Sequence, residues 1–449
     1  MRKLFGTDGI RAVAGTAPLD PTTIYAIGIA LGHSLKTADS NPRVLLGMDT
    51  RESGNWIAAV IAAGLESAGV GVVSAGVITT PAIAYLTRKH HYAAGIVISA
   101  SHNPWQDNGI KIFGSDGYKL ADATELRMEE EIFHHLEGLT APDPASLPVP
   151  AIDTQLRHEY EAFLLASVPG LNLHGMKLVI DCANGASSAI APELFSHLGG
   201  NPVFTHAKPD GRNINARCGA LYPQVVAAET MASGATMGIT FDGDADRALF
   251  SDANGNVVNG DAILLLAARD LQKKKKLTGD IVVATTMSNM GLEAALKRSG
   301  IRMLRAPVGD KYVLEMMQEK NAALGGEQSG HILFPHLATT GDGLLTALVV
   351  LDLVQRSGKP LHELCSDMKV FPQVIVNVTV REKRPLEEIP SVTRAIHAAE
   401  KELKDSGRVV IRYSGTEQLA RVMIEAESEE AMRRHADAIA EAIRAELGA

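Results

Sequence analysis

The run RVLLGMD at residues 43–49 is apolar almost to its end and begins the pattern that decides the fold. A longer helical segment follows at residues 55–68, then a second apolar run at 70–75, another helical segment at 81–89 and the run GIVIS at 95–99. Apolar runs this short predict buried strands, and the longer segments between them predict helices. Because strands that alternate with helices form mostly parallel sheets with helices on their faces, the sequence predicts an α/β domain here.

The same alternation appears twice more, in units of about 100 residues, the usual size of a domain. The second unit has predicted strands at 177–182, 202–205 and 236–241 and predicted helices at 188–198 and 225–233. The third has predicted helices at 261–272, 290–299 and 312–319 and predicted strands at 280–285, 302–306 and 322–324. The last part differs, because strands at 374–380, 408–411 and 421–425 with helices at 390–404 and 429–447 predict a small α+β domain.

The predicted fold class is therefore three similar α/β/α domains with mixed or parallel sheets, followed by a smaller C-terminal α+β domain. We place the domain boundaries at 1–150, 151–254, 255–368 and 369–449. The proline-rich stretch TAPDPASLPVP at 140–150 is typical of a linker and separates the first domain from the second. The length alone suggests about three domains, whereas the pattern of predicted strands and helices indicates four.

The composition excludes several classes of protein. Hydrophobic residues make up 46% of the 449 residues, which is too many for a disordered chain. A net charge of −9 and an aromatic content of 4% argue against a general nucleic-acid binder, which would be basic or would offer rings for base stacking. The 3 cysteines are widely spaced, which argues against a disulfide framework or a cysteine zinc site.

The sequence also lacks signals for export or membrane insertion. No apolar run approaches the roughly 18 residues of a transmembrane helix, and the N-terminal stretch has no apolar core of a secretory signal. We therefore expect a cytoplasmic protein without membrane or nucleic-acid partners, and either a monomer or a homodimer.

One polar loop follows the third strand of each α/β unit, and the second and third of these loops contain glycine. The three loops are SASHNP at 99–104, FDGDADR at 241–247 and GGEQSGH at 325–331. Ligands of open α/β sheets bind at the carboxyl ends of the strands. The position of these loops therefore predicts that they share one site.

The loop FDGDADR carries Asp242, Asp244 and Asp246 at alternate positions. Three carboxylates so close together repel one another unless a cation neutralises them, and hard oxygen ligands favour Mg²⁺ or Ca²⁺. An EF-hand is excluded, because Arg247 and Ala253 stand where it needs glycine and glutamate. The alternative is a solvated acidic turn, whereas a Mg²⁺ site would suit phosphoryl transfer.

The loop SASHNP offers Ser101, followed by His102. A serine there could merely cap a turn. Opposite a bound cation, a phosphorylated serine would instead add about −2 of charge and complete the metal's ligands. Lys111, in DNGIKIF at 107–113, is either a surface lysine or a buried one that loses its proton and serves in proton transfer.

Two further loops have the composition of anion sites. FGTDGIR at 5–11 has two glycines and ends in Arg11, but lacks the Lys-Ser/Thr of a P-loop. RYSGTE at 412–417, followed by Arg421, combines hydroxyls, a glycine and guanidinium groups that suit phosphate. In GGEQSGH, Glu327 and Ser329 suit sugar hydroxyls or an amine.

Taken together, these motifs resemble the α-D-phosphohexomutase superfamily, and within it the bacterial phosphoglucosamine mutase family. The resemblance spans nearly the whole chain, with four motifs in the family's order, and residues 99–120, GGEQSGH and ATTGDG at 338–343 look most like the glucosamine branch. It implies four domains around one central cleft. It also implies interconversion of glucosamine 6-phosphate and glucosamine 1-phosphate through a 1,6-bisphosphate, which would supply UDP-N-acetylglucosamine synthesis.

The resemblance also implies roles for particular residues. Ser101 matches the phosphoserine, and its phosphate with Asp242, Asp244 and Asp246 matches the ligands of one Mg²⁺ per chain. The matching catalytic residues are Arg11, His102 and Lys111, with Lys111 the candidate general acid or base. The matching substrate-binding residues are Arg247, Glu327, Ser329, His331, Arg412, Ser414, Gly415, Thr416 and Arg421. A sugar 1,6-bisphosphate is the implied activator.

Three alternatives stay open at this point. A phosphomannomutase/phosphoglucomutase of the same superfamily would use the same chemistry on other phosphosugars. A Mg²⁺-dependent phosphatase with a phosphoserine intermediate would release inorganic phosphate. A sugar-phosphate sensor would bind without turnover.

Overall fold

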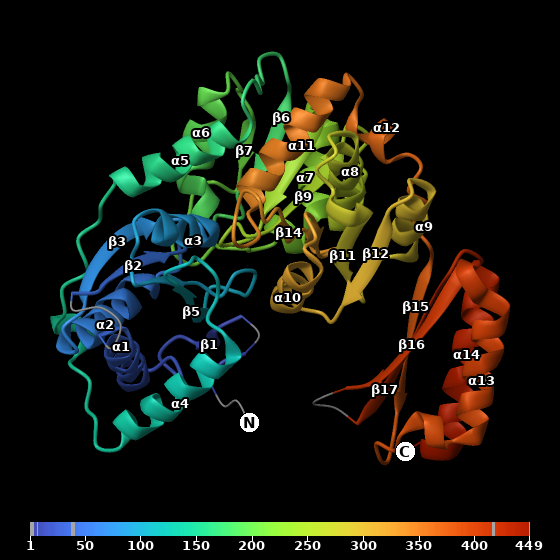
Figure 1. The fold of residues 1–449 in the computed structure, drawn as a ribbon, viewed down its shortest axis with the longest axis horizontal. Helices are drawn as coiled ribbons and strands as arrows, with labels where there is room; N and C mark the ends of the chain where they lie inside the picture. Colours follow the sequence, from blue (N-terminus) through green and yellow to red (C-terminus); the bar gives the residue numbers. More distant parts are fainter. Residues whose placement is uncertain (1–3, 7, 37–40, 415–417, 449) are drawn as a thin grey trace. The chain divides into compact units, whose positions relative to one another are not determined.

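The computed structural model describes residues 4–6, 8–36, 41–414 and 418–448 (Figure 1). The chain forms two compact units. The first comprises Met1–Met287 and Leu304–Cys365, and the second comprises Ser288–Met303 and Ser366–Ala449. The segment 288–303 thus groups with the C-terminal part rather than with its neighbours in sequence.

The first sheet has five strands in the order β1-β5-β4-β2-β3. Its strands are β1 (Ile10–Val13), β2 (Arg43–Met48), β3 (Gly71–Val77), β4 (Ala94–Ile98) and β5 (Asp107–Gly114). Strands β3, β2 and β4 are parallel, whereas β5 runs antiparallel to both β4 and β1. The sheet is therefore mixed. The loop FGTDGIR does not stay a loop to its end, because Ile10 and Arg11 begin β1 and pair with β5.

Four helices accompany this sheet: α1 (Pro21–Lys36), α2 (Gly54–Ser67), α3 (Thr80–Lys89) and α4 (Asp122–Leu136). Helices α1 and α2 lie side by side (Figure 1). Gly28 and Gly64 allow this close approach, since a Cβ on either would lie within 2.6 Å of a carbonyl oxygen of the other helix. Helix α4 packs on α1 and contributes Met128 and Ile132 to the same hydrophobic core.

The second sheet repeats the plan, in the order β10-β9-β8-β6-β7. Its strands are β6 (Leu178–Asp181), β7 (Val203–Thr205), β8 (Met237–Phe241), β9 (Ala248–Asp252) and β10 (Val257–Val258). Strands β7, β6 and β8 are parallel, and β9 runs antiparallel to β8. Helices α5 (Gln155–Ser167), α6 (Ala191–His197) and α7 (Pro223–Ser233) belong to this part of the chain.

The third sheet has the order β12-β11-β13-β14. Its strands are β11 (Ile281–Thr285), β12 (Arg302–Ala306), β13 (Gly325–Gly326) and β14 (Ile332–Leu333). The helices of this region are α8 (Gly260–Lys273), α9 (Met290–Arg298), α10 (Asp310–Lys320), α11 (Gly343–Ser357) and α12 (Leu361–Cys365). The strand predicted at 322–324 is wrong by about three residues. Leu324 only accepts one hydrogen bond from Val283, and the ladder continues on the two glycines of β13.

The C-terminal part is the predicted α+β domain. Strands β15 (Gln373–Thr379), β16 (Gly407–Tyr413) and β17 (Leu419–Ala426) form an antiparallel sheet in the order β15-β17-β16. Helices α13 (Pro390–Leu403) and α14 (Glu429–Leu447) lie together beside this sheet in Figure 1. Their apolar residues, such as Ile439 and Ile443, share one core with Val422 and Ile424 of β17.

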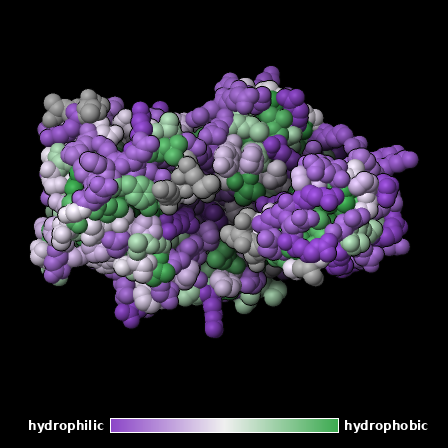
Figure 2. Space-filling view, turned by 90° about the horizontal axis from the view of Figure 1, so that it is seen from below, coloured by the Kyte–Doolittle hydropathy of each residue, from purple (hydrophilic) through white to green (hydrophobic). Residues whose placement is uncertain are grey.

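Short 3₁₀ turns complete the connections: η1 (Pro144–Ser146), η2 (Ala186–Ala189), η3 (Gly219–Leu221), η4 (Thr278–Asp280), η5 (Leu386–Glu388) and η6 (Lys404–Ser406). Hydrophilic residues dominate the face drawn in Figure 2, where hydrophobic residues form only small groups. Among the described residues, no helix is both long and apolar enough to cross a membrane.

Candidate active site

The loops after β4 and β8 meet at Ser101 and Gly243. A Cβ on Gly243 would lie 2.4 Å from the carbonyl oxygen of Ser101, so only glycine fits there. This close approach brings the Ser101 side chain to the acidic loop, and its Oγ donates a hydrogen bond to Oδ2 of Asp242 at 2.5 Å. The predicted meeting of these two loops is therefore present in the structure.

The backbone of Ser101 is held in a strained conformation. Its φ of +50° lies in the left-handed region, which is unfavourable for a residue with a side chain. The amide N–H of Ser101 donates to Oγ of Ser99 at 2.9 Å. Its carbonyl accepts hydrogen bonds from Nη2 of Arg51 and Nδ2 of Asn215, each at 2.9 Å. Strain of this kind persists only where surrounding contacts impose it, and it concentrates at functional sites.

Arg51 fastens the whole loop. Its side chain is buried and pairs with Asp49 at 2.8 Å from Nε to Oδ2. Its remaining N–H groups donate to the carbonyls of Ser101, Asn103, Pro104 and Asp107. The sequence analysis did not single out Arg51. Its position gave a signal, because it lies two residues after Asp49, at the carboxyl end of a predicted strand, where ligands bind in α/β sheets.

The acidic loop forms a compact cluster. Ligand oxygens of Asp242, Asp244 and Asp246 all lie within 4.8 Å of one another, and the three side chains are buried. Oδ1 of Asp244 and Oδ1 of Asp246 are buried without a hydrogen-bond partner. Burial, with the neighbouring Asp246 and Asp244 carboxylates, raises the pKa of Asp242 well above its usual value. Buried carboxylate oxygens this close together, two of them without a hydrogen-bond partner, fit a hard divalent cation such as Mg²⁺.

Lys111 lies against this cluster from the middle of β5. Its Nζ is 2.8 Å from Oδ2 of Asp244, 3.4 Å from Oδ2 of Asp246 and 2.9 Å from Oδ2 of Asp8. Burial lowers the pKa of Lys111, but these carboxylates outweigh burial and raise the pKa well above its usual value. The expected buried lysine is thus present, but as a cation among carboxylates rather than as a neutral amine.

A second group of charges holds the N-terminal loop. Arg11 pairs with Asp8, and Asp8 also accepts from Nζ of Lys119 at 2.5 Å. Lys119 reaches Oδ2 of Asp310 at 2.5 Å, at the start of α10. This chain of ion pairs places Arg11 beside Lys111. Sequence reasoning missed Asp8, Lys119 and Asp310, because their partners lie far apart in the sequence.

His102 and Arg247 flank the serine and the carboxylates. Nδ1 of His102 lies 3.3 Å from Oγ of Ser101. Burial, with the positive charges of Arg247 and Arg11, lowers the pKa of His102 to about 4, so the ring is neutral near pH 7. The amide of Arg247 donates to Oδ1 of Asp242 at 3.1 Å, and its Nε lies 3.8 Å from Oδ1 of Asp246.

The loop after β13 is adjacent to the acidic loop. The amide of Ala248 donates to the carbonyl of Gly330 at 3.1 Å, and Nδ1 of His331 lies 3.7 Å from Oδ1 of Asp246. Glu327 accepts from the Gly309 amide at 3.1 Å and from Oγ of Ser329 at 3.3 Å. These hydrogen bonds fix Glu327 and Ser329 side by side, where they can bind the polar groups of a ligand.

The remaining predicted residues lie in the second compact unit. Arg412 of β16 and Arg421 of β17 are directly opposite in the ladder, and Ser414 is buried beside the hairpin. Like charges directly opposite on a sheet repel each other, and an anion bound between them would relieve this repulsion. Gly415 and Thr416 lie outside the described residues.

The sequence matches models of one protein family along nearly its whole length. These are the α/β/α domains I, II and III of phosphoglucomutase/phosphomannomutase, over residues 2–138, 159–255 and 259–371, and the C-terminal domain, over 375–442. The chain belongs to this family. Its four domains match in the family's order, which confirms the resemblance to the α-D-phosphohexomutase superfamily and the predicted fold class.

Similar curated proteins indicate which branch of the family the chain belongs to. The protein named phosphoglucosamine mutase in Koribacter versatilis is 61% identical over 456 residues, covering 100% of this chain and 98% of the relative. The protein of the same name in Solibacter usitatus is 51% identical, covering 100% and 99%. The chain is therefore a phosphohexomutase-family isomerase of the phosphoglucosamine mutase branch.

Solved structures agree on the fold. A phosphoglucomutase/phosphomannomutase family protein from Burkholderia thailandensis superposes with a TM-score of 0.78 at 23% identity, covering 98% of this chain and 97% of that one. The N-acetylphosphoglucosamine mutase of Aspergillus fumigatus, solved with GlcNAc-6P and magnesium, superposes with a TM-score of 0.62 at 19% identity, covering 99% and 96%. At these identities the likeness extends to the fold alone.

Proposed function

We propose that this chain interconverts glucosamine 6-phosphate and glucosamine 1-phosphate, with phosphorylated Ser101 as the donor and a 1,6-bisphosphate as the intermediate. One observation carries the proposal: Ser101 Oγ lies 2.5 Å from Oδ2 of Asp242, at the edge of three buried carboxylates. Backbone strain concentrates at functional sites, and phosphoryl transfer uses metal ions to neutralise developing charge, so a strained serine beside buried carboxylates supports this reaction. Membership of the phosphoglucosamine mutase branch supports glucosamine as the sugar.

One Mg²⁺ per chain fits the acidic loop. Asp242, Asp244 and Asp246 would hold it, together with a phosphate oxygen on Ser101, because two of the carboxylate oxygens are buried without a hydrogen-bond partner. The bound ion would offset negative charge on the phosphoryl group during transfer. The cation of Lys111 would lie on the other side of the same carboxylates.

The chain's own groups would carry the transfer in two halves. First, the bond between phosphorus and Ser101 Oγ breaks, a bond to the free sugar hydroxyl forms, and the hydroxyl proton passes to a base in the site. The bisphosphate then turns round, the bond between its other phosphorus and the sugar oxygen breaks, and this phosphoryl group passes to Ser101 Oγ. The base returns the proton to the freed sugar oxygen. His102 is the ring nearest that oxygen, at 3.3 Å, and Arg11 and Lys111 would stabilise the moving charge.

The other residues would bind the substrate. Glu327 and Ser329 would take the sugar's hydroxyls or its amine, and Arg247 and His331 would line the same region. The phosphate that does not react would bind to Arg412, Ser414, Gly415, Thr416 and Arg421. We further propose the four domain boundaries given above, a sugar 1,6-bisphosphate as activator, a cytoplasmic location, and a monomer or homodimer.

A substrate-panel mutase assay tests this function. The purified chain is supplied with Mg²⁺, a trace of sugar bisphosphate and the 6-phosphates of glucosamine, mannose and glucose, and kcat/KM is measured for each. We expect the largest kcat/KM for glucosamine 6-phosphate and almost no release of inorganic phosphate. A higher value for mannose or glucose phosphate would instead identify a phosphomannomutase/phosphoglucomutase. Steady phosphate release would identify a phosphatase, and binding without turnover would identify a sensor.

A further inference from the structure

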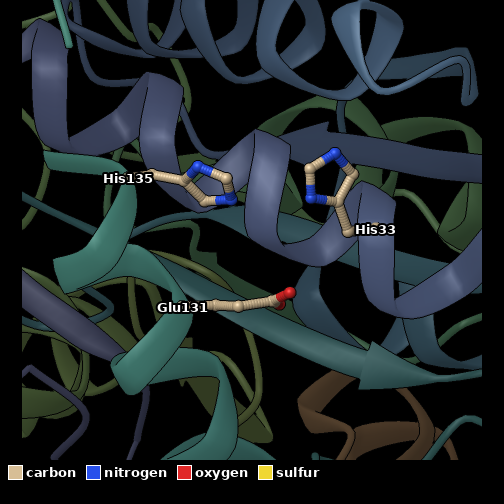
Figure 3. Close-up of side chains that lie close together, drawn as sticks. All are labelled: His33, Glu131 and His135. Carbon is tan, nitrogen blue, oxygen red and sulfur yellow. The ribbon is translucent and has the colours of Figure 1, made fainter.

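Two histidines and a glutamate gather where α4 packs on α1. His33 lies near the end of α1, and Glu131 and His135 lie one turn apart on α4. Potential ligand atoms of all three lie within 4.8 Å of one another. Figure 3 shows the two rings and the carboxylate pointing toward one shared space. His33 is exposed, and the other two are half-buried.

Within the described part of the chain, these three side chains form no hydrogen bond or ion pair with other residues. No such contact within 4.0 Å engages His33, Glu131 or His135 there, whereas Glu129 of α4 accepts the amide N–H groups of Leu4 and Phe5. The two rings face each other with centroids 5.2 Å apart and planes tilted by 59°. The three side chains are thus close enough to share one ion and are not engaged with one another.

The donor set selects the kind of ion. Imidazole nitrogen suits zinc and its neighbours in the first transition series, whereas Mg²⁺ prefers oxygen. Two histidines and one glutamate are a known zinc ligand set, and ligand atoms at about 2.0–2.2 Å around a tetrahedral ion lie about 3.4 Å apart. Small rotations of these accessible side chains close the present spacing to that value. One ligand position stays open to water.

We propose that His33, Glu131 and His135 form a zinc site that fastens α4 to α1. The site is chemically distinct from the aspartate cluster, which offers only oxygen. Its structural consequence follows from Glu129, in the same turn of α4, whose Oε1 accepts the amide N–H groups of Leu4 and Phe5 at 2.8 Å each. A metal ion that fixes α4 on α1 therefore also fixes the anchor of the N-terminal segment.

Zinc titration of the full chain in excess Mg²⁺ tests the site, because Mg²⁺ would occupy the proposed site at the aspartate cluster. The variants are His135→Ala, Glu131→Gln and His33→Gln. His134→Ala is the matched control, since His134 is the next residue on α4 but offers no ligand to the trio. Calorimetry gives the stoichiometry and affinity, and Co²⁺ as a probe gives a visible absorption that reports nitrogen and oxygen ligands.

We expect one zinc ion per wild-type chain and per His134→Ala chain, with at least tenfold weaker binding in each of the three site variants. Zinc should also raise the midpoint of thermal unfolding of the wild type and of His134→Ala, but not of His135→Ala. Unfolding of each variant without zinc shows that it is folded. Equal zinc binding by wild type and His135→Ala, full affinity in Glu131→Gln, or no zinc binding by the wild type in Mg²⁺ would overturn the proposal.

Discussion

Nη2 of Arg51 lies 2.9 Å from the carbonyl oxygen of Ser101, and the same guanidinium reaches three more carbonyls of one loop. Asp49 forms an ion pair with Arg51, and Oδ2 of Asp49 also accepts a hydrogen bond from Oγ of Ser99 at 2.6 Å. The buried ion pair of Asp49 and Arg51 thus helps Asn215 to hold the left-handed backbone of Ser101. The planar fork of arginine is needed for this, because a lysine ammonium cannot reach several carbonyls at once.

The first prediction concerns Arg51→Lys. Loss of the fork lets the Ser101 loop relax, and a displacement of about 1 Å at the reacting group costs roughly 100-fold in rate. We expect kcat to fall by about that factor while KM changes little, since the substrate-binding residues lie elsewhere. Steady-state kinetics of the mutase reaction give both constants.

Arg212→Lys is the control for this variant. Arg212 is exposed and pairs with Glu52 at the surface, so its loss should change kcat less than about twofold. A normal kcat in Arg51→Lys, or an equal fall in both variants, would contradict the positioning role of Arg51.

The second prediction concerns Asp242→Asn. The substitution removes one of three buried carboxylates. The single carboxamide oxygen can still accept from the Arg247 amide, and the new NH2 group can donate to Ser101 Oγ. The metal-free variant should be at least as stable as the wild type, because repulsion within the cluster falls. Mg²⁺ at 100 times its Kd should stabilise the wild type by about 2.7 kcal/mol but the variant far less.

Thermal unfolding with EDTA and with Mg²⁺ measures both effects of Asp242→Asn. Activity should also fall at least about 100-fold, as expected when a preorganised electrostatic group is lost. An equal Mg²⁺-induced rise in both proteins would show that the ion binds elsewhere.

The third prediction uses Asp342, which caps α11 through Leu345 and accepts from Tyr160 at 2.7 Å. Burial raises the pKa of Asp342 to about 6, despite these hydrogen bonds. A carboxyl whose folded pKa is raised stabilises the fold fully below its unfolded pKa and loses this contribution as pH rises through the folded value. Relative to Asp342→Asn, the wild type should therefore lose up to about 3 kcal/mol between pH 4 and pH 7.

Urea unfolding of both proteins in EDTA at several pH values measures this difference. The asparagine can keep both the cap and the Tyr160 hydrogen bond, so it isolates the titration of Asp342. A constant difference across this pH range would show that Asp342 keeps an ordinary pKa.

The fourth prediction concerns Arg412→Gln. Arg412 and Arg421 are cross-strand neighbours, so removal of one charge should relieve repulsion and slightly stabilise the C-terminal unit, by a few tenths of a kcal/mol. The same change should raise KM for the phosphosugar at least about tenfold, because a charge-assisted hydrogen bond to phosphate is lost. Steady-state kinetics of Arg412→Gln measure KM, and its unfolding measures the stability change. An unchanged KM would show that Arg412 does not bind the phosphate of the substrate.

The sequence predicted the buried strands and the loops that follow them, because apolar runs and loop composition are local properties. It failed where distant residues decide the outcome. For Lys111 in β5, the sequence left both an exposed and a buried side chain open, and the ion pairs with Asp8, Asp244 and Asp246 explain its burial. Gly325 and Gly326 have low strand propensity, yet their pairing with Val283 and Ala284 places them in the sheet.

The sequence also could not show which distant residues position the side chains of the candidate site. The sequence located Ser101 and the three aspartates, since each follows a recognisable strand. Arg51 and Asn215 hold the Ser101 carbonyl from positions 50 and 114 residues away, and no local pattern links them to that loop. The residues proposed to bind the ligand therefore follow local sequence patterns, whereas the residues that position them do not.

Transfer of a labelled phosphoryl group tests the central claim most directly. The chain is phosphorylated on Ser101 with ³²P and mixed with unlabelled glucosamine 6-phosphate and Mg²⁺, and Ser101→Ala is treated in parallel. We predict that the label moves to a sugar bisphosphate and then to glucosamine 1-phosphate, and that Ser101→Ala takes up no label and has no mutase activity. Full mutase activity in Ser101→Ala, or release of the wild-type label only as inorganic phosphate, would contradict it.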